Sequence, residues 1–93
     1  MATSTMKPHV GRLSVTEYGE TITVSASSTY TLTKDVSRSG YRIIGIVGVI
    51  QSNVNASVSA FVISGNNAII VVKNATTASI SDNLYLDVLY EAT

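Results

Sequence analysis

Apolar and polar residues alternate along the first third of the chain. Leu13 and Val15 alternate with serine and threonine, and the same pattern returns over residues 22–26 and around Tyr30 and Leu32. A period of two is typical of antiparallel strands that bury one face and expose the other to water. We therefore predict half-buried strands in this part of the chain, with a turn at residues 26–29.

The middle of the chain follows a different pattern. Residues 34–40 contain three charged residues, two serines and a glycine, and this composition predicts a loop. Residues 41–50 then place large aliphatic side chains in both phases of a strand. Strict alternation would put Ile43, Val47 and Val49 on one face. The opposite face would carry Ile44, Ile46 and Ile50.

The second half of the chain predicts further strands and turns. A turn at residues 51–55 precedes a strand at 56–64, and Ser-Gly-Asn-Asn at 64–67 predicts a tight hairpin, because Gly and Asn tolerate positive φ. A strand apolar in both phases follows at 68–73, then a weaker strand at 77–81, a turn at 81–83 and a last strand at 84–90. The last strand has one apolar face, formed by Leu84, Leu86, Val88 and Tyr90.

The number and spacing of these strands predict the fold class. No segment has the 3.6-residue periodicity of a helix, and seven or eight short strands follow one another along the chain. We expect an all-β fold, an antiparallel β-sandwich of jelly-roll type, with a small barrel as the alternative. Residues 1–8 lack apolar periodicity and are expected to form a flexible or docking N-terminal arm ahead of a single domain at 9–93.

Composition removes several classes of protein. The chain has 93 residues, a formal net charge of zero and 13% charged residues, about half of the ~25% that is usual. Its few lysines and arginines are scattered, so we predict no nucleic-acid partner. Cysteine is absent, which removes disulfides and thiolate chemistry. The longest apolar run is too short for a membrane helix, and the first residues do not form a signal peptide, so neither membrane insertion nor signal-dependent export is expected.

Strands that are apolar on both faces predict self-association. A small sandwich has no second layer of its own to cover the extra face, and another copy of the chain is the simplest cover. The alternatives are an N-terminal arm or loop folded over that face, or burial by barrel curvature. Gly45 and Gly48 are expected to mark bulges or points where a neighbouring chain approaches closely. The predicted interface residues are Ile44, Ile46, Ile50, Phe61, Ile63, Ile69 and Val71.

Three segments carry a resemblance to a known class of proteins. They are the run from Ser39 to Gly48, the run from Ser64 to Val71, and Asp87-Val88-Leu89-Tyr90. This pattern resembles the small β-sandwich modules of phage tail, fibre and other virion structural proteins of Gram-positive hosts. It covers roughly residues 22–90, and its most specific element is Ile-Gly-Ile-Val-Gly at 44–48.

The resemblance implies a function and a location. It implies a virion component, in a tail, a fibre or a head decoration, that forms a homotrimer and contacts other virion proteins during assembly or host attachment. Such a protein is made in the host cytoplasm and reaches the outside in the particle, without a signal peptide.

Binding of a host cell-surface glycan is the rival function. Sugar recognition generally uses an aromatic platform, and with tryptophan absent the candidates are tyrosines. Tyr30 and Tyr90 fit inward phases of their strands, whereas the candidate glycan contacts are Tyr18, Tyr41 and Tyr85. The alternative for these three is packing in the core or between subunits.

Catalytic and metal-binding patterns are not found in the sequence. The lone His9 has no evident orienting carboxylate, and Glu17 and Glu20 read as solvated charges rather than a catalytic pair. The spacing of Asp82 and Asp87 does not match a calcium loop. We therefore expect no enzyme activity, no catalytic residue, no cofactor and no metal.

Overall fold

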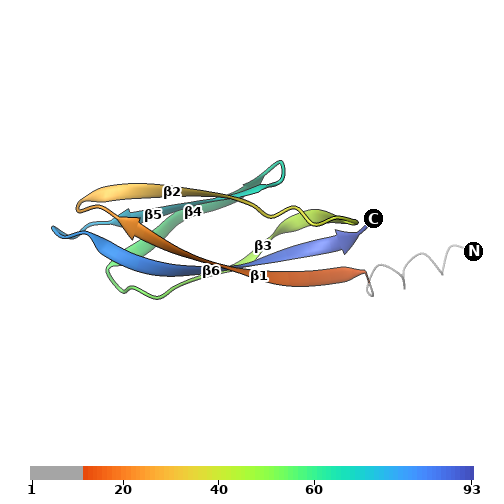
Figure 1. The fold of residues 1–93 in the computed structure, drawn as a ribbon, viewed down its shortest axis with the longest axis horizontal. Coiled ribbons are helices and arrows are strands. Elements are labelled where there is room, and N and C mark those ends of the chain that lie inside the picture. The colour runs from red at the N-terminus through yellow and green to blue at the C-terminus, as the bar shows by residue number, and fades with distance from the viewer. Residues whose placement is uncertain (1–11) are drawn as a thin grey trace, which may run out of the picture.

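A computed structural model describes residues 12–93, which form a sandwich of two sheets with three antiparallel strands in each (Figure 1). The strands are β1 (Leu13–Val24), β2 (Ser28–Asp35), β3 (Tyr41–Gln51), β4 (Ala56–Ser64), β5 (Asn67–Asn74) and β6 (Ile80–Ala92). Sheet A has the order β1-β6-β3 and sheet B the order β2-β5-β4. The predicted arm at residues 1–8, and His9, lie outside the described residues.

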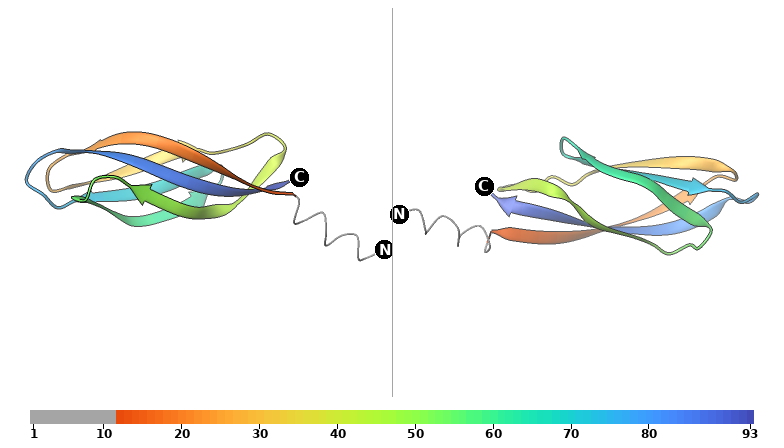
Figure 2. Two further views of the ribbon diagram at one scale, coloured as in Figure 1. Left: turned by 90° about the horizontal axis from the view of Figure 1, so that it is seen from below. Right: turned by 180° about the vertical axis from the view of Figure 1, so that it is seen from behind.

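The chain passes from one sheet to the other at every connection except the β4–β5 hairpin, so the two sheets are woven from alternating strands (Figure 2). The expected hairpin at residues 64–67 is confirmed. Gly65 has a φ of 60°, and a positive φ at the first central residue is what a type II′ turn requires. Within residues 12–93 no helix is long and apolar enough to cross a membrane.

The β-sandwich prediction is confirmed, but the predicted number of strands was wrong. The described chain has six strands, whereas seven or eight were expected and a jelly roll has eight. β1 runs unbroken from Leu13 to Val24 because every one of its residues is paired with β6. The turn expected at residues 81–83 is also paired, with residues 21–23 of β1, so the two last predicted strands are one.

The core lies between the inner faces of the sheets. The central strands β5 and β6 supply most of it, because each has neighbours on both sides and a facing sheet above. β6 contributes the whole predicted apolar face, and all four of its side chains are fully buried. The buried residues of the other strands include Ile22, Val24, Leu32, Ala56, Ala68, Ile70 and Val72.

Two bulges change which side chains of β3 face the core. The pairing of β3 with β6 skips Ile44 and then Val47, so each is an extra residue in the edge strand. The predicted bulges at Gly45 and Gly48 are thereby confirmed. Two bulges so close together turn the period of two into a period of three.

The face assignment predicted for β3 was therefore wrong. Strict alternation grouped Val47 with Ile43 and Val49, and Ile46 with Ile44 and Ile50. In the structure Ile43, Ile46 and Val49 pack against the core. The outward set is Ile44, Val47 and Ile50, which are 46%, 58% and 60% exposed.

Two buried polar side chains hold the connecting loops in place. Asn74 Nδ2 donates hydrogen bonds to the carbonyls of Val24, Ser25 and Ala78, and its Oδ1 accepts from the backbone and hydroxyl of Thr76. Asn74 therefore links the β1–β2 turn to the β5–β6 loop. Such networks fix one arrangement of the chain, since a buried polar group without a partner is costly.

Asp82 does the same for the β3–β4 loop. Its side chain is 1% exposed, and Oδ1 accepts hydrogen bonds from the backbone N–H groups of Ser52 and Asn53, at 3.0 and 2.9 Å. The hydroxyl of Ser52 donates to the same oxygen at 3.2 Å.

We predict that Asp82→Ala lowers the free energy of unfolding by about 2–4 kcal/mol, because two backbone donors lose their acceptor. Asp82→Asn keeps an acceptor oxygen in the same place and should cost less than half as much. Urea denaturation of the three proteins at pH 7 measures both changes. Equal losses in the two variants would show that the bonds to Oδ1 do not hold the loop.

Candidate interaction surfaces

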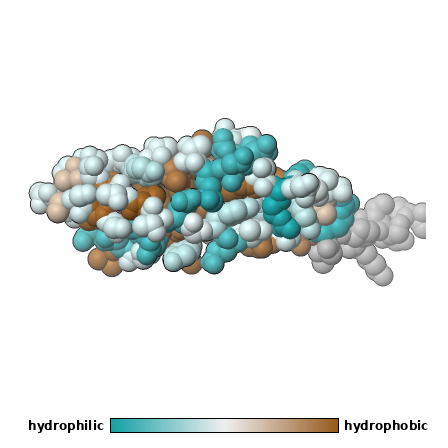
Figure 3. Space-filling view, in the orientation of Figure 1, coloured by the Kyte–Doolittle hydropathy of each residue, from teal (hydrophilic) through white to brown (hydrophobic). Residues whose placement is uncertain are grey.

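The outer face of sheet A, called here the A face, is largely apolar. The pairing of the strands shows which residues lie side by side across this face. Val15 of β1 lies opposite Leu89 of β6. Tyr85 of β6 lies between Gly19 of β1 and Ile50 of β3. The space-filling view, which sees the sandwich from the side, shows apolar groups among polar ones on that side of the molecule (Figure 3). The large apolar side chains exposed on the A face are Leu13, Val15, Ile44, Val47, Ile50 and Tyr85.

The ring of Tyr85 lies close to Gly19 of β1, where a larger residue would leave less room for it. A Cβ on Gly19 would lie 3.3 Å from the Cδ1 and Cε1 atoms of Tyr85, closer than ordinary van der Waals contact. Glycine at position 19 therefore leaves room for the Tyr85 ring beside β1, and the ring stays partly exposed to solvent.

The outer face of sheet B, called here the B face, is neutral over most of its length. Ile69 lies between Thr33 and Val62, and Val71 between Thr31 and Ala60. Val62 is exposed, and Ile69 and Val71 are half-buried. The predicted interface residues Ile69 and Val71 thus lie on an outer surface.

Two other predicted interface residues have different positions. A register shift between Val58 and Ala60 makes Phe61 and Ile63 face inward, opposite Ile70 and Ala68. Ile63 packs against the core, as Ile46 does in sheet A. Phe61 stays half exposed because β4 is the edge strand of its sheet.

A cluster of aromatic side chains lies under the loop at residues 36–40. The guanidinium carbon of Arg38 lies 3.8 Å from the centre of the Tyr41 ring and 4.9 Å from that of Tyr90, a cation–π arrangement. Its Nη1 also donates hydrogen bonds to the hydroxyls of Ser14 and Thr16, at 3.0 and 3.1 Å. Arg38 thereby fastens the loop to the inner face of sheet A.

Tyr90 is the buried centre of this cluster. Its hydroxyl donates to the carbonyl of Val36 and shares a second hydrogen bond with the hydroxyl of Tyr18. Its ring meets that of Tyr41 edge to face, with centroids 6.3 Å apart. Burial, and next the hydrogen bond from Tyr18, raise the pKa of Tyr90 above its usual range.

The three candidate glycan tyrosines are therefore not equivalent. Tyr18 and Tyr41 are half-buried and take part in the packing around Tyr90. Tyr85 presents an exposed ring on the A face. Sequence reasoning did not identify Arg38, because a loop arginine between two serines gives no sign of the rings it will cover.

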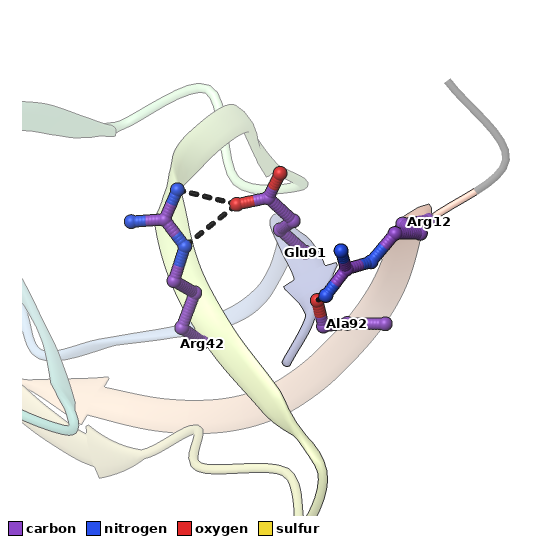
Figure 4. Close-up of polar contacts among 4 residues, drawn as sticks. All are labelled: Arg12, Arg42, Glu91 and Ala92. Atoms are coloured by element: carbon purple, nitrogen blue, oxygen red, sulfur yellow. Dashed lines mark hydrogen bonds and ion pairs between the residues drawn. The ribbon is translucent and has the colours of Figure 1, made fainter. Parts of the chain in front are cut away.

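Ion pairs tie the strands of sheet A to their neighbours. Near the chain end, Arg42 Nε donates to Glu91 Oε1 at 2.6 Å, and Arg12 donates to the carbonyl of Ala92, which joins β3 and β1 to β6 (Figure 4). Glu20, predicted to be a solvated charge, pairs with Lys34 of sheet B at 2.8 Å.

No pocket and no group of three potential metal ligands is found among residues 12–93.

We predict that Tyr90→Phe lowers the free energy of unfolding by about 1–2 kcal/mol at pH 7, since the buried carbonyl of Val36 loses its donor. Because the pKa of Tyr90 is raised in the folded state, the hydroxyl's contribution is present below the pKa of an unfolded tyrosine, about 10. It is lost as pH rises above that value. The difference between wild type and Tyr90→Phe should shrink by about 0.8 kcal/mol at pH 10.5.

Urea denaturation at pH 7 and pH 10.5 measures this difference. Tyr30→Phe is the matched control, because the hydroxyl of Tyr30 makes no hydrogen bond within residues 12–93 and its loss should change stability by less than about 0.5 kcal/mol at either pH. A difference for Tyr90→Phe that does not vary with pH would contradict the prediction.

No family model, no curated protein and no solved structure matches the chain.

Proposed function

We propose that this protein is a structural component that acts by associating with copies of itself through the outer faces of its two sheets. The observation that carries the proposal is the A face, where six large apolar side chains are exposed on three adjacent strands. Monomeric proteins rarely expose contiguous apolar patches of more than a few hundred Å². A second copy would remove this surface from water.

The particle to which we assign it is a phage virion, as a tail, fibre or head-decoration module. Support for this assignment comes from the resemblance of residues 39–48, 64–71 and 87–90 to virion β-sandwich modules. The sandwich fold agrees with that resemblance, which also implies a trimer and contacts with other virion proteins. Mass spectrometry of purified phage particles tests the assignment. Absence of the chain from all of these particles would contradict it.

Self-association is tested by light scattering on the purified protein. The wild-type protein should have the mass of several 9.8 kDa chains. A trimer would have the mass of three. Val47→Lys puts a charge on the β3 side of the A face and should give the monomer, because burying a charged side chain in an apolar contact disfavours association.

Val54→Lys is the matched control. Val54 lies in the β3–β4 loop, away from both sheet faces, and is 94% exposed. The same change there should leave the mass of the oligomer unaltered. A wild-type protein that stays a 9.8 kDa monomer at high micromolar concentration would overturn the proposed function.

Binding of a host glycan is a second candidate, favoured by the exposed ring of Tyr85. Tyr85→Ala should then weaken binding to host cells or isolated wall glycan by about tenfold or more, since an aromatic platform supplies much of the contact area. Circular dichroism and light scattering should show the fold and the mass unchanged. Tyr30→Ala is the control at a tyrosine of sheet B, and equal binding by wild type and Tyr85→Ala would exclude this role.

A further inference from the structure

Two carboxylates lie in the middle of the apolar A face. Glu17 of β1 and Asp87 of β6 are directly opposite each other in the register, and Asp87 lies beside Gly48 of β3. Apolar rows flank them, with Val15 and Leu89 on one side and Tyr85 and Ile50 on the other. Like charges in opposite positions of a sheet disfavour one another.

Neither carboxylate has a partner in the described part of the chain. Glu17 and Asp87 form no hydrogen bond and no ion pair within residues 12–93. The other described carboxylates are engaged: Asp35 by Ser37, Glu20 by Lys34 and Glu91 by Arg42, while Asp82 holds the β3–β4 loop.

The B face carries the complementary charge. Lys73 of β5 lies between the buried Val72 and Asn74, so its exposed side chain is on the outer face, between Thr29 and Ser57. Lys34 and Arg42 are ion-paired, Arg38 covers the tyrosine rings and Arg12 binds the carbonyl of Ala92. Among the described lysines and arginines, Lys73 alone forms no such contact.

The architecture prevents these charges from meeting within one molecule. The sheets pack through their inner faces, so the A face and the B face lie on opposite sides of the sandwich (Figure 2). A second copy can bring them together. Two A faces in contact would gather four carboxylates in an apolar interface, and two B faces would leave the lysines without a counterion.

We propose that the chain associates head to tail, with the A face of one copy on the B face of the next and Lys73 against Glu17 and Asp87. This rests on the proposed self-association and adds its direction. A contact between two different faces passes from copy to copy. Because the two faces lie on opposite sides of the sandwich, it builds an open stack of chains unless the rotation between successive copies closes a ring of three or more.

The apolar residues of both faces supply the contact area, while the three charges select the pairing of faces. Val62, Ile69 and Val71 lie on the B face beyond Lys73, so an apolar surface is available there to cover the apolar rows of the A face. Charge pairs at such an interface determine the choice of partner more than the total affinity.

Charge reversal on each face, followed by a swap, tests the proposal. Lys73→Glu and Asp87→Lys should each raise the dissociation constant of the oligomer at least about tenfold. The double variant Lys73→Glu/Asp87→Lys restores one pair of opposite charges across the interface, while Glu17 stays unchanged, and should recover part of that loss. Sedimentation equilibrium at several protein concentrations gives the constants, and circular dichroism checks the fold of each variant.

Val54→Glu is the matched control, because it adds the same charge outside both faces and should leave the dissociation constant unchanged. Two results would overturn the head-to-tail contact but not self-association. One is a dissociation constant that Lys73→Glu leaves unchanged, and the other is no recovery in the double variant. A monomeric wild type would instead overturn self-association itself, and the contact with it.

Discussion

The two bulges in β3 are the constraint on which the rest of the structure depends. In this edge strand of eleven residues, they direct every third side chain, those of Ile43, Ile46 and Val49, to the core. The residues that follow each of these, Ile44, Val47 and Ile50, face the solvent. Without them, strict alternation would put Ile44 and Ile46 on the same face of the strand. Val47 would then point with Ile43 toward the core. The bulges therefore create both a closed core and an apolar outer surface from one almost uncharged segment.

The same devices protect the edges of the sheets. β3 and β4 form one lateral side of the sandwich, and both are bulged, which disturbs the regular row of backbone groups that another strand could pair with. On the other side, β1 and β2 point the Glu20–Lys34 pair inward. With the edges disturbed in this way, pairing of another strand along them is disfavoured.

Sequence pattern predicted the class of fold and most of its turns, because alternation and the Gly-Asn hairpin are local signals. It failed where pairing with a distant strand decided the outcome. The polar residues around Asp82 looked like a turn, yet residues 81–83 stay extended because β1 pairs with them and Asp82 has loop donors to bind. The face of Ile46 could not be predicted either, since the position of a bulge depends on which residues of β6 it pairs with.

The sequence also predicted the candidate surfaces in part. Ile44, Ile50, Ile69 and Val71 could be named because a two-sided apolar strand must present one set of side chains outward. Val15, Val47 and Lys73 were missed, as their importance comes only from their neighbours on adjacent strands.

The low charge of the chain gives these few charges their weight. Most of the described outer strand positions carry serine, threonine or aliphatic residues, which impose little electrostatic preference on how two copies meet. On a highly charged surface, one lysine and two carboxylates would be screened or matched by many neighbours. On these faces they are the strongest directional feature present, and the proposed contact rests on them.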